Sequence, residues 1–212
     1  MLFLRHGESK WNAEGRWQGW ADPPLSRLGR RQAAEAARRL RPDGFSAVAA
    51  SDLRRARHTA ELVAAGLGLS GEIHTEPGLR EYDLGEWSGH TRAEIEAGWP
   101  VELVEWRAGR VDSAPGGEAR DVFLQRLVAA AGRVAAAFPG RRVLVISHGG
   151  AIGTLERFLG LKPLRPVHLG GRWIEASDGR LSAGPERFVL EPDDGAPGEG
   201  RDGRGRTTRP IR

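Results

Sequence analysis

Arg142-Val143-Leu144-Val145-Ile146-Ser147-His148-Gly149-Gly150 is the stretch that most strongly indicates the fold. Its consecutive apolar residues predict a fully buried strand, and the polar turn from Ser147 to Gly150 then opens a helix that runs to Leu159. A buried strand that leads through such a turn into a helix is typical of a parallel sheet covered by helices. Ligands of these sheets bind at the carboxyl ends of the strands, which makes His148 a candidate site residue.

The N-terminus repeats this pattern, because the apolar strand Leu2-Phe3-Leu4 runs directly into Arg5-His6-Gly7. We predict further strands at 46–50 and around Ile73, with edge strands at 167–173 and 187–190. The expected helices cover residues 25–40, 53–67, 102–107 and 118–138. This alternation predicts an α/β fold, a three-layer α/β/α sandwich with a mostly parallel central sheet.

The chain divides by composition into one domain at residues 1–190 and a tail at 191–212. The tail is rich in Gly, Pro, Arg and Asp and has almost no apolar residues, so we expect it to be disordered. It contains a formal dinucleotide-binding pattern at 198–203, but no strand precedes it and no amphipathic helix follows.

The composition excludes several classes of protein. With no cysteine, the chain has no disulfide, no cysteine metal site and no cysteine nucleophile. Its 32 Lys and Arg residues are scattered among 28 Asp and Glu residues, which does not favour nucleic-acid binding. No apolar run approaches the ~20 residues of a membrane span, and no signal peptide is readable, so we expect a cytoplasmic protein. No His, Asp or Glu set has metal-ligand spacing, so we expect neither a metal nor another cofactor.

Four motifs carry residues suited to phosphate chemistry. In the first, Arg5 offers a planar fork for phosphate, and Gly7 lets the backbone beside His6 approach a ligand. The second, 51–60, lies where a strand meets a helix N-terminus, whose exposed N–H groups and dipole favour anions. The third is the loop 79–89, and the fourth is the turn 147–150.

These four motifs, in this order, resemble the histidine phosphatase superfamily, which includes cofactor-dependent phosphoglycerate mutases and many small phosphatases. The resemblance begins at Leu4-Arg5-His6-Gly7-Glu8-Ser9 and continues through 11–12, 15–20 and 24–29. It covers roughly residues 1–160 and extends less clearly to 190. One such motif is weak evidence, whereas four in order at strand ends strongly indicate the family.

The resemblance implies a role for each matching residue. His6 is expected to be the nucleophile that becomes phosphorylated, and Glu81 the general acid. A bound phosphate dianion beside Glu81 would favour its protonated form. Arg55 is chosen over Arg54 because the family's arginine directly precedes the alanine of this motif. The remaining expected contacts are the phosphate pocket of Arg5, Arg55, His148 and Asn12, and the substrate-binding positions Gln18, Gly19 and Gly149.

Three functions remain open, namely a phosphomonoesterase, a phosphoglycerate mutase and a non-catalytic phosphate-binding module. The intact set Arg5, His6, Arg55, Glu81 and His148 disfavours the module. Glu81 and His148 are 148 − 81 = 67 positions apart, whereas the mutases resembling this family carry a longer insert there. We therefore favour a phosphatase acting on a small phosphorylated metabolite, either as a monomer or as a homodimer.

The segment 107–115 is the expected specificity cap, in which Arg107 and Arg110 are candidates for binding a second anionic group of the substrate. His168 is expected near the substrate mouth, and Trp17, Trp20 and Trp106 are candidates for shaping the pocket. Ala119 stands where the family often has a hydroxyl residue, so one substrate contact of the family is missing.

Overall fold

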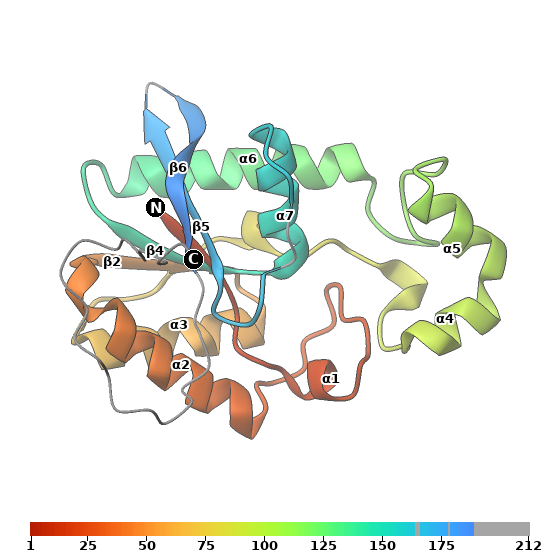
Figure 1. Cartoon of the computed structure of the whole chain (residues 1–212), viewed down its shortest axis with the longest axis horizontal. Helices are drawn as coiled ribbons and strands as arrows, with labels where there is room; N and C mark the ends of the chain where they lie inside the picture. Colours follow the sequence, from red (N-terminus) through yellow and green to blue (C-terminus); the bar gives the residue numbers. More distant parts are fainter. Residues whose placement is uncertain (164–165, 178, 189–212) are drawn as a thin grey trace, which may run out of the picture.

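The computed structural model describes residues 1–163, 166–177 and 179–188. A six-stranded sheet with the order β3-β2-β4-β1-β5-β6 forms its centre (Figure 1). The strands are β1 (Leu2–Arg5), β2 (Ala47–Ala50), β3 (His74–Thr75), β4 (Val143–Ser147), β5 (Gly171–Ser177) and β6 (Arg180–Phe188). The first four in chain order are mutually parallel, whereas β5 runs antiparallel to both β1 and β6.

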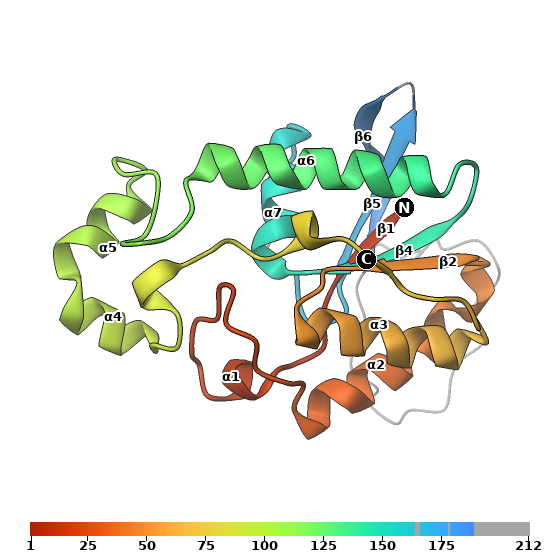
Figure 2. The same cartoon turned by 180° about the vertical axis from the view of Figure 1, so that it is seen from behind.

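Helices cover both faces of this sheet. The α-helices of the described residues are α1 (Lys10–Ala13), α2 (Arg27–Leu40), α3 (Arg54–Leu67), α4 (Arg92–Gly98), α5 (Pro100–Arg107), α6 (Arg120–Ala137) and α7 (Gly149–Phe158). Helices α2 and α3 pack on one face and α6 and α7 on the other, while α4 and α5 lie beyond one end of the sheet (Figures 1 and 2). The predicted α/β/α sandwich with a mostly parallel sheet is therefore confirmed.

Alternating side chains of the strands build two cores. Phe3 of β1, with Val143 and Val145 of β4, joins the cluster beneath α6 and α7. Leu2 and Leu4 point to the opposite cluster, which α2 and α3 cover. Strand side chains alternate between faces with a period of two, so an uninterrupted apolar strand supplies both layers at once.

Two local predictions need correction. The edge strands expected at 167–173 and 187–190 are instead the hairpin β5–β6, with strands at 171–177 and 180–188. The residues before it form a turn in which the buried Leu169 has a φ of 59°. Helix α4 was not predicted, although Thr91 and Glu94 form a capping box at its start. The predicted boundary at 190 and the tail 191–212 lie outside the described residues.

No helix in the described part of the chain combines the length and the apolar character that crossing a bilayer requires.

The turn after β1 is packed against the first turn of α2. A Cβ atom on Gly29 of α2 would lie 2.0 Å from the backbone oxygen of Glu8, and one on Gly7 would lie 2.6 Å from the oxygen of Gly29. Two glycines thus allow the α2 backbone to approach the loop that follows His6.

We expect Gly29→Ala to lower the free energy of unfolding by about 1–3 kcal/mol, because the added methyl group must displace backbone. Gly132→Ala is the matched control, since this helical glycine of α6 has no atom within 4 Å of a built Cβ. There the substitution should stabilise the protein by up to ~1 kcal/mol through helix propensity. Urea unfolding of both variants measures the difference, and equal effects would contradict this packing argument.

Candidate active site

The side chains of His6 and His148 emerge side by side at the carboxyl end of the sheet. Strands β1 and β4 are parallel neighbours in which Arg5 pairs with Ser147, and the His6 N–H donates to the Ser147 oxygen at 2.9 Å. The next residue of each strand is a histidine, and the two ring centroids lie 5.2 Å apart. The parallel register therefore brings together two turns that are more than a hundred residues apart in sequence.

The hydrogen bonds of His6 indicate which ring nitrogen carries the proton and which carries the lone pair. Nδ1 lies 2.7 Å from the Gly7 oxygen, which can only accept, so we assign the ring proton to Nδ1. Nε2 then carries a lone pair, and the Nε–H of Arg55 donates to it at 3.3 Å. His6 is 3% exposed. The nitrogen with a lone pair is thus Nε2, in a ring that is oriented by the Gly7 oxygen and that contacts the Arg55 guanidinium.

His148 precedes α7 as its N-cap residue and is completely buried. Neither of its ring nitrogens has a hydrogen-bond partner among the described residues. Buried polar atoms nearly always have such partners, so the unpaired ring indicates that a ligand group completes this site.

Both histidines are held in the neutral form. Burial lowers the pKa of His6 well below its usual value, and the nearby charges of Arg55 and Arg5 lower it further. Burial is also the main cause of the lowered pKa of His148, followed by Arg55 and His6. A neutral imidazole is the nucleophilic form, so the same surroundings that attract an anion keep His6 reactive.

Arg55 is buried at the start of α3 and is fixed by backbone oxygens of the loop between α1 and α2. Its Nη1 donates to the Ala21 oxygen at 2.7 Å and its Nη2 to the Gly19 oxygen at 2.8 Å. Burial lowers its pKa to about 10, which still leaves the guanidinium charged at neutral pH. Arg54 is exposed, consistent with the choice of Arg55.

Glu81 is half-buried in the loop after the short 3₁₀ helix at 77–79. Its carboxylate accepts hydrogen bonds from the N–H of Gly150 and from that of Tyr82, both at 2.9 Å. A Cβ on Gly150 would lie 2.4 Å from the Glu81 carboxylate. The glycine pair that follows His148 therefore also makes room for Glu81.

The other predicted contact residues belong to the end of β1 or to the segments that follow β1 and β4. Asn12 Oδ1 accepts from the backbone N–H of Ser9 at 3.2 Å, and the Ser9 hydroxyl donates to Gln18 at 2.7 Å. Gly19 has a φ of 49° and orients Arg55 through its oxygen. Gly149 begins α7, where N–H groups have no partner within the helix. Arg5 donates to the Pro166 oxygen and contributes its charge to the surroundings of both histidines.

The structure also brings in residues that the motifs did not assign. Thr59 accepts from the Gly7 N–H at 3.1 Å and donates to the Arg55 oxygen at 2.6 Å, which links the two motifs. The ring of His168 lies 5.9 Å from that of His6, as expected of a residue near the mouth. Arg126 and Trp20 contact the backbone of Glu81.

The expected anion grips in the cap are already paired with carboxylates. Arg107 contacts Glu96, and Arg110 makes two hydrogen bonds to Glu105, at 2.6 and 2.7 Å. Without a bound ligand both arginines contact carboxylates of the cap, and their binding of a second anionic group stays a prediction. The cap also packs aromatic rings together, since Trp106 lies 6.1 Å from Trp17, centroid to centroid.

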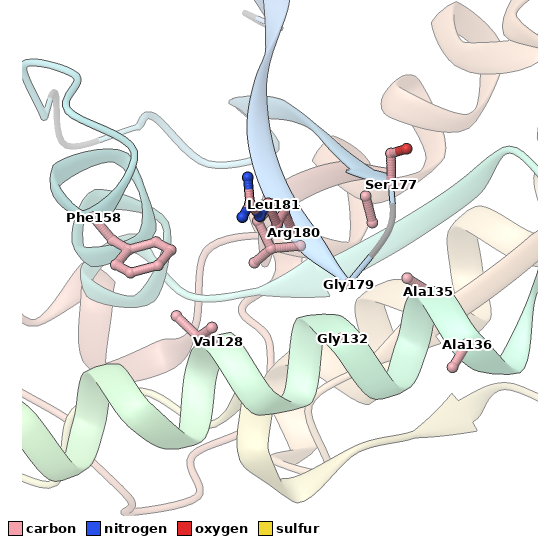
Figure 3. A pocket seen from close by; sticks show the side chains of 10 residues that line it. Val128, Gly132, Ala135, Ala136, Phe158, Ser177, Gly179, Arg180 and Leu181 are labelled. Carbon is pink, nitrogen blue, oxygen red and sulfur yellow. The ribbon is translucent and has the colours of Figure 1, made fainter.

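A hollow at the other end of the fold is chemically unlike this site. It lies between α6, the end of α7 and the tip of the β5–β6 hairpin (Figure 3). Because β5 runs antiparallel to β1, the hairpin tip lies at the end of the sheet where β1 begins, opposite the end at which His6 follows β1. The residues that line the hollow are apolar apart from Ser177 and Arg180.

The lowered pKa values of the histidines predict how stability depends on pH. Above pH ~6.5 the rings are neutral in both the folded and the unfolded chain. Below it the unfolded chain binds protons that the folded chain does not, so the free energy of unfolding falls as the pH drops toward the folded pKa values. Each histidine contributes up to about 1.4 kcal/mol per pH unit.

Between pH 6.5 and 5, we expect His148→Asn to weaken the dependence of the free energy of unfolding on pH by the equivalent of about one bound proton. Urea unfolding at several pH values measures this dependence. The two proteins share every other ionisable side chain, so the difference between their slopes isolates His148. An unchanged slope would contradict a neutral, buried ring.

Comparison with known proteins relates this site to a family. Residues 1–178 match the profile of the histidine phosphatase superfamily (branch 1). A protein of Cronobacter sakazakii named "Probable phosphoglycerate mutase GpmB" is 39% identical over 166 residues, which are 76% of this chain and 75% of the relative.

Two solved structures have the same fold. Bacillus stearothermophilus YhfR has a TM-score of 0.80 at 31% identity, over 89% of this chain and 96% of its own. A mycobacterial glucosyl-3-phosphoglycerate phosphatase in complex with VO3 has a TM-score of 0.77 at 29% identity, over 89% and 99% respectively.

Proposed function

Because this chain belongs to the histidine phosphatase superfamily, we propose that it is a phosphatase that hydrolyses small phosphomonoesters through a phosphohistidine on His6. The observation that carries the proposal is the orientation of His6, whose buried ring directs its Nε2 lone pair at Arg55 beside the unpaired His148. A nucleophile and cationic donors around one small space are the requirements of phosphoryl transfer.

In the first step, Nε2 of His6 attacks phosphorus and the bond from phosphorus to the leaving oxygen breaks. Glu81, in its protonated form, transfers its proton to that oxygen, so the alcohol leaves neutral. Arg55 exchanges its contact with Nε2 for a phosphoryl oxygen, and Arg5 and His148 hold the others. We expect Asn12 and the Gly149 N–H to donate to the phosphoryl oxygens as well, and Gln18 and Gly19 to contact the rest of the substrate.

In the second step, a water molecule attacks the phosphohistidine and the nitrogen–phosphorus bond breaks. Glu81, now a carboxylate, accepts a proton from that water and is ready for the next cycle. His6 regains its neutral form with Nδ1 still bonded to Gly7, so the ring need not reorient between the steps.

A phosphoglycerate mutase is the second candidate, and the similarity to a protein named as such a mutase favours it. A mutase must return its phosphoryl group to a second substrate before water intervenes, which requires a site closed to solvent. Between Glu81 and the start of α6, the chain forms two short α-helices, α4 and α5, and these make up the cap. This short cap favours the phosphatase.

A release assay over a panel of phosphorylated metabolites, with and without EDTA, tests the proposal. We expect phosphate release that chelation does not reduce, because the two arginines supply the positive charge that a metal would otherwise provide. Among the described residues, no group of three His, Cys, Asp or Glu side chains converges as a metal ligand set. Loss of activity with EDTA and recovery with a divalent ion would contradict this mechanism. Net conversion between phosphoglycerates without phosphate release would identify the mutase.

A further inference from the structure

Arg126 of α6 uses its whole hydrogen-bonding capacity on the surroundings of Glu81. Its Nη1 donates to the backbone oxygens of Gly78 and Arg80 at 3.0 and 2.8 Å, and its Nη2 donates to that of Glu81 at 2.7 Å. The remaining two N–H groups hold the Glu118 carboxylate at 2.6 and 2.8 Å. A guanidinium has five N–H donors, so each has a partner.

These contacts give the loop an anchor that its own backbone lacks. The oxygens of residues 78–81 lie outside any strand, and unpaired backbone oxygens in partly buried loops need donors from elsewhere. The Glu81 oxygen receives a second hydrogen bond, from Trp20 Nε1 at 2.8 Å. The guanidinium of Arg126 lies 5.6 Å from the Trp20 ring centroid, so both donors are parts of one packed group.

The pair of Arg126 and Glu118 is well shielded from water, with side-chain exposures of 18% and 9%. Two parallel hydrogen bonds between a guanidinium and a carboxylate fix the plane of the arginine. Glu118 thereby orients Arg126, and Arg126 orients the carbonyl groups of the loop. The chain of contacts ends at the backbone of the proposed general acid.

We propose that Arg126 is a positioning residue for catalysis, which holds the loop so that the Glu81 carboxyl group faces the leaving oxygen. The inference rests on the general-acid role of Glu81 in the proposed function. Proton transfer requires hydrogen-bond distance, so a displaced Glu81 loses its effect while the phosphate pocket around His6 remains intact.

The test measures kcat/KM for an alkyl phosphate and for a nitrophenyl phosphate in Arg126→Lys. An ammonium group keeps the charge but cannot contact three oxygens and a carboxylate together. The matched control is Arg133→Lys on the same helix. Arg133 also makes two hydrogen bonds to a carboxylate, that of Glu76, at 2.9 Å each, but none to the backbone of Glu81.

We expect Arg126→Lys to slow the alkyl phosphate about 10-fold more than the nitrophenyl phosphate, because misplacement by 1 Å can cost ~10²-fold. The control should slow both substrates by the same small factor. In a Glu81→Gln background, Arg126→Lys should add no further bias, meaning that it should slow the alkyl and the nitrophenyl phosphate by the same factor, because the group that it positions is already lost.

Equal slowing of both substrates by Arg126→Lys, with a lowered melting temperature, would show a merely structural role and overturn the inference. A bias that persists in the Glu81→Gln background would overturn it as well. If Glu81→Gln alone shows no bias, the general-acid role itself fails, which is a separate result. If Arg126→Lys does not fold, Glu118→Gln is measured instead, with the same expected bias and the same contradictory outcomes.

Discussion

His6→Ala is expected to abolish turnover, lowering kcat by on the order of 10³-fold or more, because it removes the nitrogen on which the covalent intermediate is proposed to form. Arg5, Arg55 and His148 remain, so the variant should still bind inorganic phosphate. Phosphate release measures the first effect, and calorimetric titration with phosphate measures the second.

The matched control is His58→Ala, since His58 lies on α3 outside the pocket and should be dispensable. Retention of more than a few per cent of activity in His6→Ala would contradict the assignment of the nucleophile. Loss of phosphate binding together with activity would show instead that the variant had lost the pocket.

The second large effect separates the roles of Glu81 and Arg55. Glu81→Gln should slow an alkyl phosphate by ~10²–10⁴-fold, the usual contribution of a general acid. It should slow a nitrophenyl phosphate far less, because nitrophenolate leaves readily without a proton. The two carboxylate oxygens of Glu81 accept separately from the N–H groups of Tyr82 and Gly150, whereas the single oxygen of an amide can accept from one of them.

Arg55→Ala should slow both substrates about equally, since the phosphoryl group that it holds is the same in both. It should also weaken inhibition by free phosphate. The comparison needs the rates of both variants with both substrates, and the inhibition constant of free phosphate for Arg55→Ala. If Glu81→Gln slowed both substrates by one factor, the general-acid role would pass to Glu8 or Asp83, which lie near the same loops.

Much of the fold could be predicted because its central strands are continuous apolar runs. The strand 143–147 is buried at every position, which is the pattern of a sheet covered on both faces. The hairpin β5–β6 was misplaced because β5 has polar and exposed residues over its second half. Its position depends on contact with β1, where Gly171 allows the Phe3 backbone to approach. Such long-range contacts leave no local signal.

The candidate site was predicted at the level of motifs, and the structure adds how they are connected. Strand register explains why His6 and His148 meet, and Thr59 links the turn after β1 to Arg55. The function of Arg126 could not be predicted, because its partners are mainly backbone oxygens 45 to 48 positions away. Any residue type supplies such an oxygen, so sequence patterns contain no trace of these contacts.

Trapping the phosphoenzyme tests the central claim most directly. Glu81→Gln should accumulate the intermediate with a nitrophenyl phosphate, since transfer to His6 needs little acid catalysis whereas attack by water needs the base. The quenched protein is digested and analysed by mass spectrometry. We expect one phosphoryl group on the peptide that contains His6, labile in acid and stable in base, as a phosphoramidate is. A phosphoryl group on another residue, or turnover with no labelled His6 at any time, would contradict the account.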